Sequence, residues 1–389
     1  MARRVRPGLE VLRERPGVLR GQRFGLVANP ASVTADLAPA ASILARLGDA
    51  RLVTLFGPEH GLAANAQDLV EVGDSRDPSS GLPVFSLYGE TRVPTPSMLE
   101  GLDAVVVDLQ DVGSRYYTYV YTMLHVLEAC ARDGKRVLVL DRPNPIGGEA
   151  VDGNVLDSPY ASFVGLHTLA VRHGMTIGEL ALMFREERRL DVDLQVVRMR
   201  GWHRSMHFED TSLPWVLPSP NMPTVDTAFV YPGGCLVEGT NLSEGRGTTR
   251  PFELVGAPWI DGTRLADALE REDLPGASFR PAAFTPTFQK HAGSVCEGVQ
   301  VHVRDRRRFD AYLSYLLLIH HARRQDRRRF AWREPPYEYE TRKLPFDILC
   351  GTDRVRRAIE ADRSPRRLVQ GWTRERTAFL KRRTRHLLY

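Results

Sequence analysis

The chain is poor in cysteine, and this shortage excludes several kinds of protein. Its 389 residues contain only four cysteines, which are too widely scattered for a CxxC pair or a zinc-ligand spacing. A disulfide-stapled scaffold and a structural zinc site are therefore not expected. We expect free, buried thiols at the four positions, which are Cys130, Cys235, Cys296 and Cys350.

Lysine is also scarce, and the positive charge is modest. Of 53 basic residues only four are lysine, and the net charge is +5. The two short arginine runs, 306–308 and 327–329, have acidic residues nearby and no ladder of aromatic residues beside them. A nucleic-acid-binding surface needs a segregated basic face, so we expect no nucleic-acid partner.

Long apolar runs and the common cofactor motifs are missing. No window approaches the roughly 20 apolar residues of a membrane span, so we expect no membrane partner. The first residues, MARRVRPGLEVLRERPG, lack the apolar core of a signal peptide, which predicts a cytoplasmic protein. The chain has no GxGxxG, Walker A or GxSxG motif and no evident metal quartet, so we expect neither a cofactor nor a bound metal.

Short β-rich runs alternate with helix-like segments in the first half of the chain. The runs include RFGLVA (23–28), LVTLF (52–56), AVVVDL (104–109) and RVLVL (136–140). Continuous apolar strands that alternate with helices are typical of a mostly parallel sheet covered on both faces. We therefore predict an α/β fold with a Rossmann-like sheet.

The amino-acid composition changes near residue 213, where a long segment rich in Pro, Gly, Thr and Asn begins. We predict that this segment is not helical and that its aromatic residues keep it ordered. A strand at 298–303 and helices near 309–323, 352–361 and 372–382 predict a smaller α+β region. The predicted domains are 1–225, which carries the strand-end loops, and 226–389, which closes a cleft.

Polar residues follow four of the predicted strands at the point where each ends. Asn29 follows the first, Glu59 and His60 the second, Asp108, Gln110 and Asp111 the third, and Asp141, Arg142 and Asn144 the fourth. In parallel sheets ligands bind outside the carboxyl ends of the strands. Polar residues after four strands at one sheet edge favour a binding or catalytic site over four unrelated turns.

The motif GPEHG carries Glu59 as a candidate general acid or base, with His60 beside it. From the residues alone, a solvated pair at the end of a strand is an equally good interpretation. Asp108 and Asp111 are further candidate carboxylates, which environment could divide into acid and base roles. His60, Asp108 and Asp111 could also be assembled into a metal site, although no spacing requires it.

Other candidate binding residues lie in the segments that follow. Arg115 is a candidate ligand or the ion-pair partner of a nearby carboxylate. Tyr116 and Tyr117 suit either the core or the stacking of a sugar ring. His173 precedes a predicted helix, and we interpret Glu179 in that helix as part of a capping box with Thr176.

The loop EGTNLSEGRGTTRPFE (238–253) is the strongest single signal. It combines glycines, hydroxyls and an amide with arginines and acids in one stretch. Arginine between glycines favours bidentate binding of a carboxylate over a surface salt bridge. The candidate binding residues here are Glu238, Asn241, Glu244, Arg246 and Arg250.

Seven motifs together resemble one family. They are NPASV, LFGPEHGL, DLQDVGSRYYTYVYTM, VLDRPNPIGG, RHGMTIGELA, PSPNMPT and EGTNLSEGRGTTRPFEL with GAPW, and the similarity extends from about Gly21 to the terminal HLLY. In this order they look like the bacterial exo-acting β-N-acetylmuramidases, long known only as an uncharacterised domain.

The resemblance implies a glycoside hydrolase that removes N-acetylmuramic acid from the non-reducing end of peptidoglycan fragments. It implies a Rossmann-like domain and a smaller C-terminal domain with the site between them. Glu59 would be the catalytic acid, Asp108 and Asp111 site carboxylates, and Asn221 of PSPNMP a binding residue. The implied partner is a muropeptide or a disaccharide of N-acetylmuramic acid and N-acetylglucosamine.

Several alternatives stay open at this point. A non-catalytic binding protein for an anionic sugar and a metal-assisted hydrolase are the competing functions. The sequence does not choose among retaining, inverting and substrate-assisted hydrolysis, which differ in the second catalytic group. The oligomeric state is also not set by the sequence.

Overall fold

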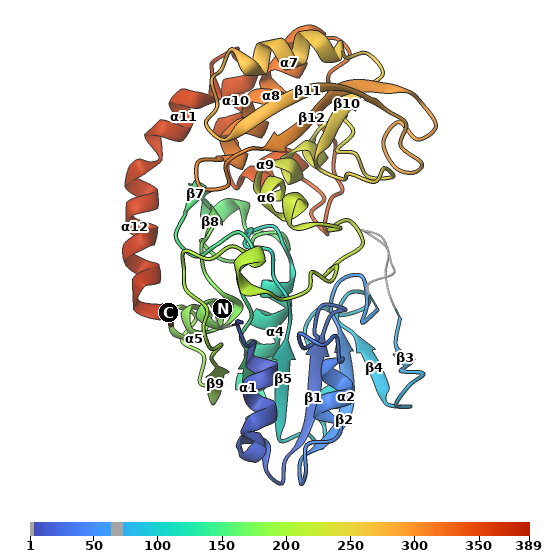
Figure 1. Ribbon diagram of the computed structural model, residues 1–389, viewed down its shortest axis with the longest axis vertical. Helices are drawn as coiled ribbons and strands as arrows, with labels where there is room; N and C mark the ends of the chain where they lie inside the picture. The colour runs from blue at the N-terminus through green and yellow to red at the C-terminus, as the bar shows by residue number, and fades with distance from the viewer. Residues whose placement is uncertain (1–3, 64–72) are drawn as a thin grey trace.

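The computed structural model describes residues 4–63 and 73–389 and contains three β-sheets. The largest sheet has seven strands in the order β3-β4-β2-β1-β5-β6-β9 and is parallel except for the β3–β4 pair. Its strands are β1 (Arg23–Ala28), β2 (Arg51–Gly57), β3 (Ser75–Arg76), β4 (Pro83–Ser86), β5 (Ala104–Asp108), β6 (Arg136–Leu140) and β9 (Leu194–Val197). The predicted α/β fold with a mostly parallel sheet is confirmed (Figure 1).

Alternate residues of the central strands face opposite layers of the core. In β5, Val105 and Val107 pack in one cluster, whereas Ala104 and Val106 pack in the other. One layer is built by α4 (Tyr119–Arg132) and α5 (Ile177–Glu187), and the other by α1 (Gly8–Glu14) and α2 (Ala40–Leu44). Both faces of the sheet are therefore buried, which explains why the strands read as continuous apolar runs.

The second half of the chain forms a smaller α+β region. Its sheet is antiparallel, in the order β10-β12-β11, with β10 at Leu254–Ala257, β11 at Ala277–Phe284 and β12 at Cys296–Val303. The helices here are α6 (Val225–Gly234), α7 (Gly262–Glu270), α8 (Ala311–Gln325), α9 (Pro345–Cys350), α10 (Arg354–Glu360), α11 (Pro365–Gly371) and α12 (Thr373–Arg383). The remaining elements are the short helix α3 (Pro96–Leu99) and the pair β7 (Asp152–Val155) and β8 (Ala170–Arg172).

One expectation about this half was wrong. The segment after residue 213 is not without helix, because α6 runs from Val225 to Gly234 even though Pro232 lies inside it. The Thr224 side chain accepts a hydrogen bond from the Thr227 N–H and so caps the helix. Nearly every residue of α6 is buried, so tertiary packing outweighs the cost of the proline and the two glycines.

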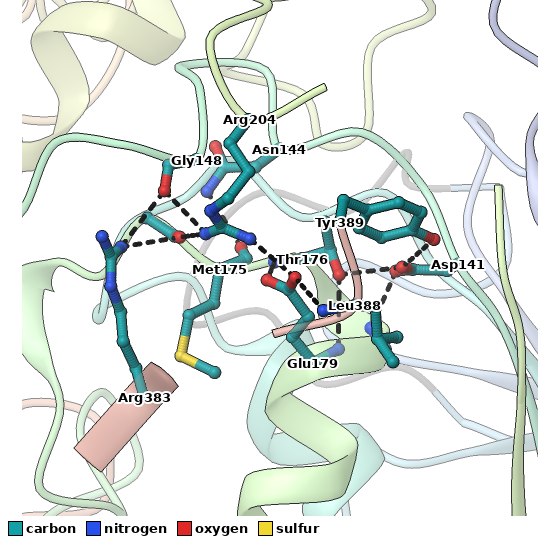
Figure 2. A network of polar contacts seen from close by, with 12 residues as sticks. Asp141, Asn144, Gly148, Met175, Thr176, Glu179, Arg204, Arg383, Leu388 and Tyr389 are labelled. Carbon is teal, nitrogen blue, oxygen red and sulfur yellow. Dashed lines mark hydrogen bonds and ion pairs between the residues drawn. The ribbon is translucent and has the colours of Figure 1, made fainter. Parts of the chain in front are cut away.

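The C-terminal end of the chain returns to the N-terminal half of the fold. Helix α12 descends along one side of the molecule, and the last residues lie close to α5 (Figure 1). The Tyr389 hydroxyl donates to Asp141 at 2.8 Å, and the Leu388 N–H donates to Glu179 at 2.9 Å (Figure 2). Glu179 also forms the predicted capping box with Thr176. This network ties the chain end to the sheet edge where β6 terminates.

Within the described ranges, no helix is both long and apolar enough to cross a membrane.

Candidate active site

A cavity lies beyond the carboxyl end of β2, between the two halves of the chain. It encloses about 540 Å³ of empty space, a figure that includes the open solvent at its mouth. The described residues that line it come from both halves: Glu59, His60, Tyr116, Tyr117, Thr118, Tyr119, Val164, Ser219, Asn221, Met222, Tyr231, Cys235, Glu238, Arg246, Phe252, Tyr337 and Glu338.

Glu59 enters this cavity from the turn after β2. The turn requires a left-handed backbone at His60 and Gly61, whose φ values are 70° and 79°. Glu59 is only 6% exposed, and its Oε2 accepts a hydrogen bond of 2.5 Å from the Thr118 hydroxyl. Thr118 immediately precedes α4, so the helix start fixes the donor. The carboxyl group is thus buried, oriented and in contact with the cavity.

Tyrosine and phenylalanine rings form one wall. Tyr117 packs edge-on against Tyr119, with ring centroids 4.8 Å apart, and against Tyr231 at 5.9 Å. Tyr231 in turn meets Phe252 at 4.9 Å. Burial, aided by nearby carboxylates that include Asp111, raises the pKa of Tyr117, so its hydroxyl stays protonated. Protonated hydroxyls on apolar rings suit a sugar, which has apolar faces and polar edges.

A charged cluster adjoins this wall, since the Arg246 guanidinium lies 5.1 Å from the centre of the Phe252 ring. Arg246 donates to Glu238 Oε1 at 2.9 Å, and the Tyr337 hydroxyl donates to Glu238 Oε2 at 2.8 Å. Burial opposes ionisation of Glu238, but Arg246 and Tyr337 outweigh it and hold the pKa of Glu238 below its usual value. Glu244 behind them pairs with Arg246 at 3.4 Å and with Lys290 at 2.7 Å. The cluster is therefore charge-balanced.

Seven of the residues predicted from the sequence line the cavity. They are Glu59, His60, Tyr116, Tyr117, Asn221, Glu238 and Arg246. The structure therefore brings together the GPEHG turn, the start of α4, the PSPNMP segment and the glycine-rich loop. Their roles in chemistry remain proposals.

The polar residues after β1, β5 and β6 do not reach the cavity. Both oxygens of Asp108 are held by Arg142, at 2.6 and 2.8 Å, and the pair is buried. The Asn29 side chain bonds the backbone of Gln110, and the Gln110 side chain bonds two backbone carbonyls. The strand ends do meet at one edge, as predicted, but these side chains hold the loops together beneath the site.

Asp111, Asn144 and His173 form a second supporting group. Asp111 accepts from the Gly113 N–H at 2.7 Å and faces His173 Nε2 at 3.5 Å. Asn144 bonds the Met175 carbonyl and the Ile146 N–H. All three are buried, and none of them lines the cavity.

Three arginine and asparagine predictions also fall outside the cavity. Arg115 is completely buried and donates to four backbone carbonyls, two of them in α9, so it joins the two halves of the chain. Asn241 bonds the backbone at Arg329 and Ala331. Arg250 is half-exposed and pairs with Glu253 at 3.2 Å. Glu244 does not line the cavity but pairs with Arg246, which does.

Sequence reasoning missed ten of the lining residues. Ser219 and Met222 flank Asn221, so the PSPNMPT motif pointed to their neighbourhood, and Thr118 and Tyr119 adjoin the predicted tyrosines. Tyr231, Cys235 and Phe252 reach the cavity through α6 and the loop after it. No sequence pattern indicated that Tyr337 and Glu338 line the cavity. Their segment, EPPYEYE, is distant in sequence from the other candidate residues and matches no catalytic motif.

Nothing in the described part of the chain forms a cluster of three or more His, Cys, Asp or Glu side chains able to hold a metal ion. His60, Asp108 and Asp111, considered as such a set from the sequence, do not share the cavity.

Comparison with known proteins places these motifs in context. Family models for the N-terminal and C-terminal parts of the exo-β-N-acetylmuramidase NamZ match residues 24–226 and 229–389. A curated relative from Bacillus subtilis strain 168, peptidoglycan β-N-acetylmuramidase NamZ, is 48% identical over 374 residues, which is 95% of this chain and 88% of the relative.

Two crystal structures of DUF1343 family proteins from Bacteroides fragilis are also similar. One has a TM-score of 0.90 at 35% identity, and the other a TM-score of 0.79 at 30% identity. In both comparisons the match covers 99% of each chain. The similarity therefore extends over both halves of the fold.

Proposed function

The chain belongs to the exo-β-N-acetylmuramidase family and is a glycoside hydrolase, and from this premise we propose that it releases terminal N-acetylmuramic acid from peptidoglycan fragments. The proposed substrate is a muropeptide or a disaccharide with N-acetylmuramic acid at the non-reducing end. We also propose that residues 1–225 form the catalytic domain and residues 226–389 the domain that closes the cleft.

The observation that carries this proposal is the position of Glu59. Its carboxyl group is buried, is oriented by Thr118 and lies at a cavity that is also lined by the tyrosine wall. Cleavage of a glycosidic bond requires a proton on the leaving oxygen, and a buried carboxylic acid is the usual donor. We therefore propose Glu59 as the general acid, with His60 and Asn221 in contact with the substrate.

We infer the mode of sugar binding from the aromatic wall and the charged cluster. We propose that the pyranose ring packs on the tyrosine wall and that Arg246 faces the lactyl carboxylate of N-acetylmuramic acid. Arg246 is preferred over Arg250 because Arg246 lines the cavity and Arg250 does not. For Asp108 and Asp111 we propose supporting roles beneath the site, since each is occupied by neighbouring groups.

The test is product analysis with a defined disaccharide. Purified protein is incubated with β-1,4-linked N-acetylmuramic acid–N-acetylglucosamine, and release of both free sugars is followed by chromatography. Chitobiose, which lacks the lactyl group, and a trisaccharide that begins with N-acetylglucosamine serve as controls and should remain uncut. Cleavage within longer chains, or no cleavage of the disaccharide by folded protein, would contradict the proposal.

Glu59→Gln tests the role of the acid in the same assay. A general acid contributes roughly 10²–10⁴-fold, so turnover of the disaccharide should fall by about that factor. Glu100→Gln, the same change at an exposed position after α3, should behave as the unchanged protein. If Glu59→Gln binds substrate normally and keeps full turnover, Glu59 is not the acid.

A further inference from the structure

A tight turn at residues 337–340 brings Glu338 from the C-terminal half to the cavity. Tyr337 and Glu340 exchange two backbone hydrogen bonds of 2.9 Å, so Glu338 and Tyr339 occupy the two central positions. Their φ values are 45° and 67°. Turns with positive φ at both central positions normally contain Asn, Asp or Gly, because other residues are strained there by roughly 1–2 kcal/mol.

Strain of this kind concentrates at functional sites, and here it fixes the direction of a carboxylate. The turn is docked on the first half of the chain. The Tyr88 hydroxyl donates to Glu338 Oε2 at 3.2 Å, and the Arg92 guanidinium lies 4.1 Å from the centre of the Tyr339 ring. Glu338 is 7% exposed and lines the same cavity as Glu59. Two carboxylates from opposite halves of the chain therefore share the site.

Tyr88 is also affected by the charge of both carboxylates. Burial raises the pKa of Tyr88, and the negative charges of Glu59 and Glu338 raise it further. Tyr88 itself stays protonated and keeps its hydrogen bond to Glu338.

The third acid of the cavity is unsuited to a role in proton transfer. Each oxygen of Glu238 accepts a hydrogen bond, one from Arg246 and one from the Tyr337 hydroxyl. These partners hold its pKa low against the effect of burial. Both oxygens of Glu238 are therefore committed to the charged cluster, whereas Glu338 enters the cavity from the docked turn.

We propose that Glu338 is the general base of the reaction, the second catalytic carboxylate, an inference that rests on the proposed function. A water molecule attacks the anomeric carbon and gives one proton to Glu338. The bond between that carbon and the leaving oxygen breaks, and the oxygen takes its electron pair and the proton of Glu59. The net change is addition of one water across the bond, and proton exchange with solvent restores Glu59 and Glu338.

This assignment predicts that each carboxylate controls one side of the pH profile of kcat/KM. Glu338 must be ionised and Glu59 protonated, so kcat/KM for the disaccharide should rise and then fall with pH. Glu338→Gln should lose roughly 10²–10⁴-fold in kcat, with KM little changed, and should lack the rise on the acidic side. Glu59→Gln should lack the fall on the alkaline side.

Controls separate a base from a merely structural residue. Glu334→Gln makes the same change at an exposed glutamate of the same segment and should be fully active. Tyr88→Phe removes one hydrogen bond to Glu338 but keeps the carboxylate, so its kcat should fall far less than that of Glu338→Gln. Binding of free N-acetylmuramic acid, measured by calorimetry, should be retained in all variants.

The decisive test is rescue of Glu338→Ala by added formate, a small carboxylate that can occupy the vacated space. Formate should raise kcat at least tenfold in Glu338→Ala and should not raise that of Glu59→Ala. A Glu338→Gln variant with unchanged kcat would overturn the assignment of Glu338 but not the proposed function. A Glu338→Ala variant that binds sugar but is not rescued would do the same. If the unmodified protein cleaves no muramide, the proposed function fails and the assignment fails with it.

Discussion

Arg115 is the residue whose replacement should most clearly separate structure from chemistry. It is fully buried, and its guanidinium donates to the carbonyls of Asn154, Leu169, Leu349 and Cys350 at 2.9–3.1 Å. Arg115→Met keeps the length and the apolar part of the side chain but removes every donor. We expect a less stable protein whose folded fraction still has an intact cavity.

The magnitude follows from the fate of the four carbonyls. Leu169 O also accepts from the Leu156 N–H, and Cys350 O from the Asn154 side chain, so these two remain bonded. The carbonyls of Asn154 and Leu349 lose the guanidinium, at roughly 1–3 kcal/mol for each buried group. Relief of the buried charge offsets part of this cost. The free energy of unfolding should therefore fall by about 2–4 kcal/mol.

Urea unfolding, followed by circular dichroism, measures this change, and Arg250→Met is the matched control. Arg250 has a half-exposed side chain and one ion pair with Glu253, so its replacement should cost less than about 1 kcal/mol. Turnover per folded molecule should be unchanged in Arg115→Met. Equal stability of the two variants, or a selective loss of substrate binding in Arg115→Met, would refute the structural role of Arg115.

Three further predictions concern single positions. Thr118→Val removes the hydroxyl that orients Glu59, and kcat for the disaccharide, measured in steady state, should fall by roughly 2–10-fold because a hydrogen bond to a neutral acid is worth about 0.5–1.5 kcal/mol. Burial lowers the pKa of His320 from 6.5 to about 4. The contribution of neutral His320 to the free energy of unfolding is therefore present above pH 6.5 and is lost as the pH falls toward 4. In urea titrations, His320→Gln should make the free energy of unfolding depend less on pH over this range. Gly113→Ala places a Cβ 2.4 Å from Asn144 Oδ1 at a φ of +82°, so the free energy of unfolding should fall by roughly 1–3 kcal/mol, and an unchanged urea midpoint would contradict that contact.

The fold was predictable because its signals are local and repeated. Continuous apolar runs such as 104–109 and 136–140 predicted parallel strands buried on both faces, and the structure confirms β5 and β6 there. The polar residues after four strands predicted a site at one sheet edge, but only those after β2, Glu59 and His60, line the cavity. Helix α6 was missed because Pro232 and the two glycines after it suggest a turn, and only long-range packing keeps that segment helical.

The site was predictable only in part, because residue type does not say where a side chain points. Asp108 and Arg115 have the chemistry of site residues, yet one is neutralised by Arg142 and the other holds backbone carbonyls. Conversely, Tyr337 and Glu338 reach the cavity through a turn more than 270 residues from Glu59 in sequence. Contacts over such separations depend on how the two halves pack, which local patterns do not encode.

The central claim is that Glu59 protonates the leaving oxygen. The most direct test is whether the loss of turnover in Glu59→Gln depends on the leaving group. Turnover of 4-nitrophenyl β-N-acetylmuramide and of the disaccharide is compared in the unmodified protein and in Glu59→Gln. An activated phenol departs without a proton, whereas a sugar alcohol needs one. The account predicts a loss of roughly 10²–10⁴-fold with the disaccharide and a far smaller loss with the nitrophenyl substrate. Equal losses with both substrates, or no loss with the disaccharide, would contradict it.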